Sequence, residues 1–216
     1  MKGIITLLII SFQFTHCALQ PPHESGIFKA NDLVELIHID PTLKLDIRYA
    51  TNNNFVGRPV YKEARAFMQR DAAKALAVAN KKLHEQGYGL LIFDGYRPWS
   101  ITKLFWDITP EDKRIFVADP KQGSRHNRGC AVDLSMFDLT TGKEIEMTGA
   151  YDEMSERSFP YYTGGTDLQR NMRETLRTAM ESSGFSVFEY EWWHFDYNDW
   201  RKYRIGTVRF EEIGVK

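Results

Sequence analysis

The segment Ser124-Arg-His-Asn-Arg-Gly-Cys-Ala-Val-Asp133 and the later segment Glu191-Trp-Trp-His194 together contain two imidazoles and two carboxylates. Zinc in hydrolases usually takes three protein ligands from His, Asp and Glu, and it leaves its fourth position open. The segments therefore predict one zinc ion (Zn²⁺) per chain, held by three residues: His126, Asp133 and His194. A second carboxylate, Glu191, remains as a general base that would take a proton from the attacking water and pass it to the leaving amine.

The residues around Asp133 favour a metal site. Gly129 supplies a position where the backbone can turn freely, so His126 and Asp133 could converge from a loop and from the strand that follows it. Asp133 stands in the small and apolar run Cys130–Leu134, where a carboxylate needs a cation or hydrogen-bond donors to offset its desolvation. Cys130, with small neighbours on both sides, fits a buried residue better than a ligand or a nucleophile.

The aromatic segment 185–197 is predicted to be a strand, and this creates a geometric problem. On a regular strand Glu191 and His194 would face opposite sides of the sheet. Both can approach one metal ion only if the strand contains a bulge or a bend at Trp192-Trp193. The sequence therefore predicts an irregularity there, and the Trp pair is expected to pack in the core and to narrow the pocket.

The motif Ser-x-His-x-x-Gly-x-Ala-x-Asp at 124–133, followed by Glu-x-x-His at 191–194, resembles the motif pair of the zinc D-Ala-D-Ala peptidases, whose fold is shared with the Hedgehog signalling domain. Asp94-Gly-Tyr-Arg-Pro98 is similar to a segment of the vancomycin-resistance type D-alanyl-D-alanine dipeptidases, as is the Trp pair of the second motif. Two further segments resemble the same proteins: Leu45-Asp-Ile-Arg-Tyr-Ala-Thr51 and Tyr151-Asp-Glu-Met-Ser155. The resemblance extends from about Leu45 to about Trp200.

This resemblance implies a fold and an activity. The expected fold is α+β, a single domain with a central, mostly antiparallel sheet flanked by helices. The expected activity is the zinc-dependent hydrolysis of the dipeptide D-Ala-D-Ala to free D-alanine, so the expected partner is a small D,D-dipeptide.

Arg97 has two interpretations from the residues alone. Pro98 keeps Arg97 out of helical geometry, so its guanidinium could stabilise the oxyanion that forms when water attacks an amide. Alternatively, Arg97 pairs with Asp94 and braces the turn. In the dipeptidases the arginine of this segment is assigned to transition-state stabilisation, with its neighbouring Asp as support. The resemblance therefore implies a catalytic role for Arg97 and a supporting role for Asp94.

Three residues are candidates for binding the substrate. Asp152 by itself is more often a surface acid, but the resemblance implies that it receives the free ammonium group of the dipeptide. Tyr49 is a further candidate for the same end of the pocket, and Ser124 of the first motif is the third. A pocket closed at the amine end would favour dipeptides over longer chains.

The length and composition of the chain limit the number of domains and the classes of partner. A chain of 216 residues can bury one sizeable core, and nothing requires a second domain. Its 43% hydrophobic and 13% aromatic residues are typical of an ordinary globular protein. With 28 Lys and Arg against 29 Asp and Glu, no overall field attracts a polyanion, so nucleic acid is not an expected partner.

Residues 1–18 are predicted to be a signal peptide, and 19–216 the catalytic domain. A short basic start precedes the apolar run Ile4–Phe14, which is too short to span a bilayer comfortably, so no stable membrane span is expected. The protein is therefore expected to be exported, either to the periplasm or out of the cell. Cys17 leaves a lipid anchor as an alternative, although His16 is bulky where a bacterial lipoprotein signal has a small residue.

The hydrophobic pattern predicts most secondary-structure elements. Apolar-polar alternation and one apolar run predict three strands: 33–39, 43–49 and 90–93. Helical spacing predicts three helices: about 62–86, about 99–107 and about 166–183. The segment 137–145 resembles a hairpin that turns around Thr141-Gly142 and would lie beside the ligand-bearing strand.

Two other functions stay open at this stage. The chain could be a D,D- or L,D-carboxypeptidase that trims peptidoglycan stems, because the related metal motif also serves those enzymes. It could also be a non-catalytic Hedgehog-like zinc module, although the presence of both Glu191 and Arg97 argues against a purely structural metal.

Overall fold

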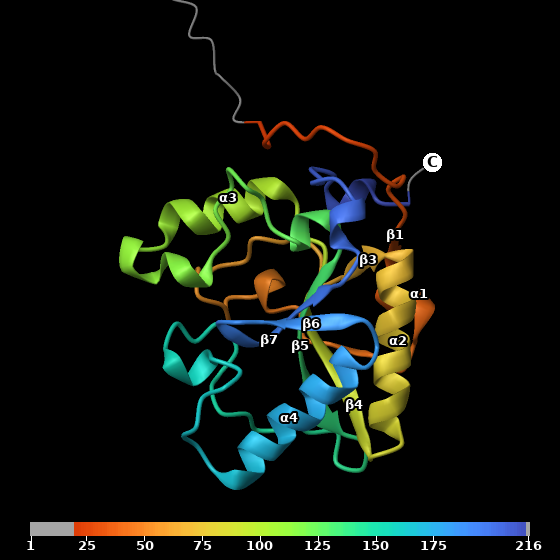
Figure 1. Cartoon of the computed structure of the whole chain (residues 1–216), viewed down its shortest axis with the longest axis vertical. Coiled ribbons are helices and arrows are strands. Elements are labelled where there is room, and N and C mark those ends of the chain that lie inside the picture. Colours follow the sequence, from red (N-terminus) through yellow and green to blue (C-terminus); the bar gives the residue numbers. More distant parts are fainter. Residues whose placement is uncertain (1–19, 215–216) are drawn as a thin grey trace, which may run out of the picture.

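The computed structural model describes residues 20–214, and a five-stranded sheet forms the centre of the protein (Figure 1). Its strands lie in the order β2 (Lys44–Leu45), β4 (Tyr88–Asp94), β5 (Ala131–Asp138), β7 (Glu191–Tyr197) and β6 (Phe185–Phe188). The β2–β4 pair is parallel and the other three pairs are antiparallel, so the predicted α+β fold with a mostly antiparallel sheet is confirmed. The predicted signal peptide (1–18) and Cys17 lie outside the described residues.

Helices α2 (Arg70–His84) and α4 (Asp167–Glu181) pack against each other and against strands β4 and β6 (Figure 1). Helix α4 begins with a capping box, in which Thr166 and Gln169 each accept the backbone N–H of the other. Helix α3 (Trp99–Ile108) lies apart from this pair (Figure 1). Within residues 20–214, no helix combines the length and the apolar character needed to cross a membrane.

The structure changes the predicted bounds near the N-terminus. The segment 33–39 forms a short strand, β1 (Leu33–Glu35), and then one helical turn, α1 (Leu36–Ile39). Strand β1 pairs antiparallel with β3 (Phe67–Gln69), so α2 begins after β3 and later than the predicted start near residue 62. The side chains of β3 are buried, and the pairing of β3 with β1 keeps these residues out of the predicted helix.

The predicted strand 43–49 is also shorter than expected. Only β2 pairs with the sheet, at its edge, and the chain then forms a 3₁₀ turn, Arg48–Ala50. This turn buries the aromatic ring of Tyr49, which is 2% exposed. The change of direction therefore places Tyr49 in the interior of the protein.

In the second half of the chain one prediction is confirmed and one needs correction. The segment 137–145 forms the predicted hairpin: it turns at Gly142, Phe137 bridges Glu144, and the backbone N–H groups of Asp138 and Ile145 donate to the carbonyls of Lys143 and Met136. Its first side is the end of β5 itself, whose neighbours in the five-stranded sheet are β4 and β7. The segment 185–197 forms two strands, β6 and β7, because the chain reverses between them. The predictions that correspond to β4, α3 and α4 are confirmed.

Candidate metal centre and active site

Three adjacent strands place the predicted polar residues in one row. Asp94 of β4 lies opposite Asp133 of β5, and Asp133 lies opposite His194 of β7. Directly opposed residues have Cβ atoms about 4.5–5.5 Å apart on the same face of a sheet. The register of the sheet therefore brings together three side chains that are far apart in the sequence.

His126 reaches this row from the loop before β5. Its 3₁₀ turn, His126–Arg128, ends at Gly129, whose φ of 65° lies in the left-handed region that glycine adopts without strain, as predicted. The Nδ1–H of His126 donates to the carbonyl of Gly95 at 2.7 Å, so Nε2 faces the other two ligands. Gly95 has no room for a side chain, because a Cβ there would lie 2.6 Å from the carbonyl oxygen of Phe67.

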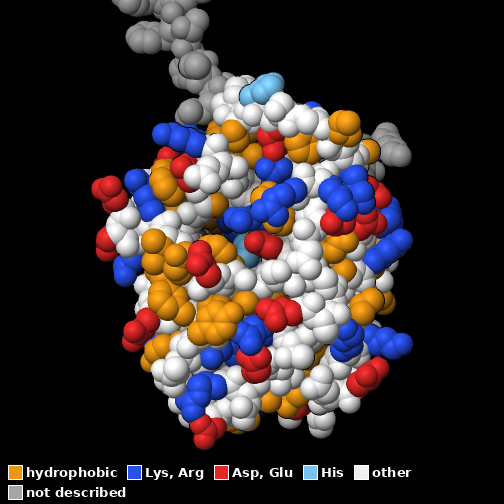
Figure 2. Space-filling view, viewed as in Figure 1, with side chains coloured by type: hydrophobic (Ala, Val, Ile, Leu, Met, Phe, Trp, Pro, Cys, Tyr) orange, Lys and Arg blue, Asp and Glu red, His pale blue; other side chains and the backbone are white. Residues whose placement is uncertain are grey.

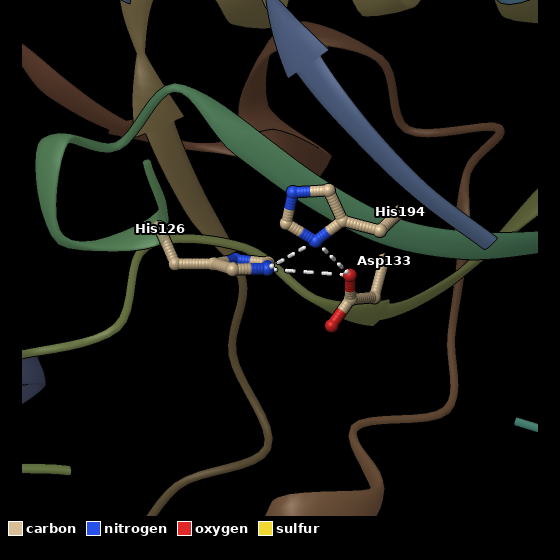
Figure 3. A group of neighbouring side chains, drawn as sticks. All are labelled: His126, Asp133 and His194. Carbon is tan, nitrogen blue, oxygen red and sulfur yellow. Dashed lines mark hydrogen bonds and ion pairs between the residues drawn. The ribbon is translucent and has the colours of Figure 1, made fainter. Parts of the chain in front are cut away.

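Figure 3 shows the three predicted ligands pointing toward one another. His126 Nε2 lies 3.1 Å from His194 Nδ1 and 3.2 Å from Asp133 Oδ1, and His194 Nδ1 lies 3.0 Å from Asp133 Oδ1. These three atoms form the ligand triangle. All three residues are buried. Ligand atoms about 2.0–2.2 Å from a tetrahedral ion are roughly 3.3 Å apart, so the triangle fits one face of such a coordination shell. Two imidazole nitrogens and a carboxylate oxygen form a donor set that zinc accepts.

Asp196 holds the second imidazole from behind. The Nε2–H of His194 donates to Asp196 Oδ1 at 2.9 Å, which leaves Nδ1 for the metal. Burial alone would lower the pKa of His194, but the carboxylates of Asp196 and Asp133 raise it to about 10. Burial would raise the pKa of Asp133, yet the imidazoles of His126 and His194 hold that pKa well below its ordinary value. The carboxylates therefore create a field that attracts a proton or a metal ion.

Glu191 reaches the same centre because β7 is irregular. Val187 pairs with Phe195, but the next residue, Phe188, pairs with Glu191, so part of β7 bulges out without partners in β6: Trp192, Trp193 and His194. The predicted irregularity at the Trp pair is confirmed. Glu191 Oε2 lies 3.7 Å from His194 Nδ1. Burial raises the pKa of Glu191 to about 8, which marks a carboxylate held in an unusual environment.

Arg97 is buried beside the ligand triangle and is paired with two carboxylates. Its Nε donates to Asp94 Oδ2 at 2.9 Å, and one terminal nitrogen lies 2.8 Å from the same oxygen and 3.5 Å from Asp133 Oδ2. The Tyr61 hydroxyl and the Gly95 N–H also donate to Asp94. Asp94 therefore braces Arg97, and the guanidinium also lines the cavity, so the geometry accommodates both interpretations of Arg97.

Asp152 lines the cavity in a backbone conformation that non-glycine residues rarely adopt, with a φ of 62°. The Tyr49 hydroxyl donates to Asp152 Oδ1 at 3.0 Å. Asp152 Oδ2 is buried, and among the described residues it has no hydrogen-bond partner. Burial, together with the charge of Asp133, raises the pKa of Asp152 to about 7. A cationic group of a ligand would satisfy this oxygen.

The cavity has a volume of about 100 Å³, and every predicted site residue except Asp94 lines it: Tyr49, Arg97, Ser124, His126, Asp133, Asp152, Glu191 and His194. Ser124 is buried, and its hydroxyl accepts the backbone N–H of His126 at 3.2 Å, so it braces the His126 loop. Trp193 lines the cavity while both Trp side chains are buried, in agreement with the expectation for that pair.

Four polar residues near this centre were not predicted as site residues: Tyr61, Arg125, Tyr151 and Asp196. The Tyr151 hydroxyl donates to Asp133 Oδ2 at 3.1 Å and so supports a predicted ligand. Asp196 could have been found from strand alternation, because a residue two positions after His194 faces the same side. Arg125 could have been found from its place immediately before His126, whereas Tyr61 carries no comparable signal, since only tertiary contacts bring it to the site.

Comparison with known proteins gives matches along most of the chain. A family model described as D-ala-D-ala dipeptidase matches residues 29–208. A D-alanyl-D-alanine dipeptidase of Escherichia coli K12 is 34% identical over 165 residues, which cover 76% of this chain and 84% of that protein. A D-alanyl-D-alanine dipeptidase of Enterococcus faecalis is 35% identical over 181 residues, which cover 76% of this chain and 88% of that protein. A solved vancomycin-resistance D,D-dipeptidase in complex with a D-Ala-D-Ala phosphinate analogue aligns with a TM-score of 0.41 at 21% identity, over 77% of this chain and 66% of that one.

Proposed function

The chain belongs to the D-ala-D-ala dipeptidase family of metallopeptidases, and we propose that it hydrolyses D-Ala-D-Ala to free D-alanine with one bound Zn²⁺ ion. One observation carries this proposal: the buried ligand triangle has Glu191 Oε2 only 3.7 Å from one of its corners. Structural zinc sites are usually closed by a fourth protein ligand, whereas catalytic sites keep one position open. Three ligands beside a buried glutamate therefore favour a catalytic ion over a structural one.

A bound zinc ion would polarise the scissile carbonyl and lower the pKa of the attacking water. Glu191 accepts the proton of that water and delivers it to the amine nitrogen as the C–N bond breaks. The Arg97 guanidinium donates to the oxyanion that forms on the carbonyl oxygen. Asp152, held by the Tyr49 hydroxyl, receives the substrate ammonium group, and Ser124 contacts the dipeptide from the loop before β5.

The test of this function is D-alanine release by the purified protein. We expect release from D-Ala-D-Ala and none from a stem pentapeptide that ends in D-Ala-D-Ala, because the ammonium that Asp152 would bind is replaced there by an amide. Release from the pentapeptide at a comparable rate would instead support the alternative, a D,D-carboxypeptidase. Release of D-alanine from a tetrapeptide stem would support an L,D-carboxypeptidase.

Replacing Arg97 with Lys is expected to lower kcat for D-Ala-D-Ala by about 10²–10³-fold, because one donor to the developing oxyanion is lost while a positive charge remains for Asp94. The KM should change much less. The measurement is steady-state kinetics together with a thermal melt. A matched control is Arg65→Lys, since Arg65 also pairs with two carboxylates, Glu35 and Glu63, but does not line the cavity. An Arg97 variant with a lower Tm and an unchanged kcat would leave Arg97 with the bracing role alone.

We also propose that the protein is exported, to the periplasm or beyond, and acts in the turnover or scavenging of cell-wall fragments. The basic start and apolar run of residues 1–18 support this proposal, since they are typical of a signal peptide. Mass spectrometry of the protein from its own cells tests it. An intact N-terminus on the cellular protein would overturn export by signal cleavage, and a lipid-modified Cys17 would identify a lipid anchor.

A further inference from the structure

Arg125 is a second cationic residue in the wall of the cavity, immediately before the ligand His126. Its guanidinium carbon lies 4.9 Å from the centre of the Trp200 ring, and its Nε lies 3.4 Å from Asp196 Oδ2. The side chain is 38% exposed. Trp200 and Asp196 therefore hold the guanidinium from behind, while part of it remains open to a ligand.

The two cationic residues of the cavity wall differ in how far their donors are used. The Nε and one terminal nitrogen of Arg97 contact Asp94, and that terminal nitrogen also lies near Asp133. Within residues 20–214, no acceptor lies in hydrogen-bonding geometry with a side-chain nitrogen of Arg125, and its buried Nε makes an ion-pair contact with Asp196 Oδ2 without forming a hydrogen bond. A guanidinium offers five N–H donors in a planar fork that matches a carboxylate. Arg125 therefore has unused donors of the kind that bind carboxylates.

A dipeptide with free ends carries one positive and one negative charge, and each charge needs a partner when it leaves water. Asp152, with its unpaired Oδ2, is the partner assigned to the ammonium. Figure 2 shows a hollow with a histidine at its base, and both basic and acidic side chains lie along its edge. The described residues that line the cavity include two basic residues, Arg97 and Arg125. Since Arg97 is assigned to the oxyanion, Arg125 remains for the substrate carboxylate.

We propose that Arg125 binds the C-terminal carboxylate of the substrate and so makes the enzyme selective for peptides with a free carboxyl end. This inference rests on the proposed dipeptidase function and adds a specificity residue to it. Because Arg125 also touches Asp196, which supports His194, a competing explanation exists. Arg125 could merely position the metal ligand, and in that case its loss would affect every substrate equally.

The test compares D-Ala-D-Ala with D-Ala-D-alaninamide, in which a neutral amide replaces the carboxylate. For the wild-type protein we expect kcat/KM to be about 10- to 150-fold higher for the acid, the size of one hydrogen-bonded charge pair. Arg125→Met should remove most of that ratio, mainly through a higher KM for the acid. Arg125→Lys, which keeps the charge but not the fork, should restore part of the ratio. Metal content should stay at the wild-type level in both variants.

Arg201→Met is a matched control, since Arg201 also stacks on Trp200, at 4.2 Å, but does not line the cavity. Its ratio of kcat/KM for the acid to kcat/KM for the amide should equal that of the wild-type protein. Equal losses on both substrates in Arg125→Met would overturn the inference and assign Arg125 to positioning, and so would a wild-type protein that does not distinguish acid from amide. A wild-type protein that does not hydrolyse D-Ala-D-Ala would overturn the proposed function itself, and this inference with it.

Discussion

Removal of the bound divalent ion with a chelator is expected to bring D-alanine release down to the background rate. The ion would be held by three buried side chains, and the carbonyl and the attacking water would both depend on it. One equivalent of Zn²⁺ should restore the turnover, as measured by D-alanine release and by elemental analysis of the same samples. Full turnover by protein that retains no measurable metal would contradict the metallopeptidase mechanism for this chain.

Zinc binding by the metal-free protein is expected to depend on pH. The neighbouring carboxylates raise the pKa of His194 to about 10, so the ring is protonated at neutral pH until an ion displaces its proton. Zinc binding should therefore release protons and should weaken as the pH falls. A calorimetric titration in buffers of different ionisation enthalpy measures this proton release. Because the ion binds only the folded chain, zinc should also raise the Tm.

Variants of single histidines separate the metal site from general effects of histidine loss. His126→Ala should abolish zinc binding, because it removes one corner of the ligand triangle. His38→Ala is the matched control, since the His38 side chain is 74% exposed and lies outside the cavity wall. The control should keep both its metal and its turnover. A His126 variant that binds zinc with wild-type affinity would place the metal elsewhere.

Glu191→Gln is expected to lower kcat by about 10²–10⁴-fold while the metal stays bound, because the amide cannot accept the proton of the attacking water. Burial raises the pKa of Glu191 to about 8, so the metal-free protein already holds this side chain largely neutral at pH 7. A neutral side chain of the same shape should therefore not destabilise the fold. The measurements are kcat for D-Ala-D-Ala, metal content and Tm.

Glu189→Gln is the control for this variant. It is the same substitution two positions away, and Glu189 is exposed in the turn just before β7. Its kcat should equal that of the wild type. Wild-type turnover by Glu191→Gln would remove Glu191 from the mechanism. Loss of zinc in the same variant would show that Glu191 supports the metal and does not act on the proton.

Much of the centre could be predicted from the sequence because its chemistry is local. The spacing around Gly129 and the apolar run that carries Asp133 both indicate a metal ligand, whatever the rest of the fold. The bulge in β7 followed from a conflict between strand geometry and the need for Glu191 and His194 to meet. Resemblance to a known family, rather than spacing, supplied the roles of Arg97 and Asp152.

The predicted secondary structure failed where long-range pairing decided the outcome. The residues of β3 fall within the bounds of the helix predicted over 62–86, yet they pair with β1, because burial beside another strand outweighs weak local propensity. Such pairings depend on which strand is available in space, and local patterns of hydrophobic residues do not reveal that. The hairpin expected over 137–145 does form, because its pairing is local: the chain turns at Gly142 and residues 143–145 return beside the end of β5.

The sequence by itself determined which atoms can bind a metal, since the ligand chemistry belongs to the side chains: His126, Asp133 and His194. Only the tertiary structure decided how those atoms are held. The sheet register aligns Asp133 with His194, Asp196 orients the second imidazole, and packing leaves Arg125 with unused donors at the cavity wall. The physical reason is that ligand identity is a covalent property of the chain, whereas orientation and desolvation arise from contacts between distant segments.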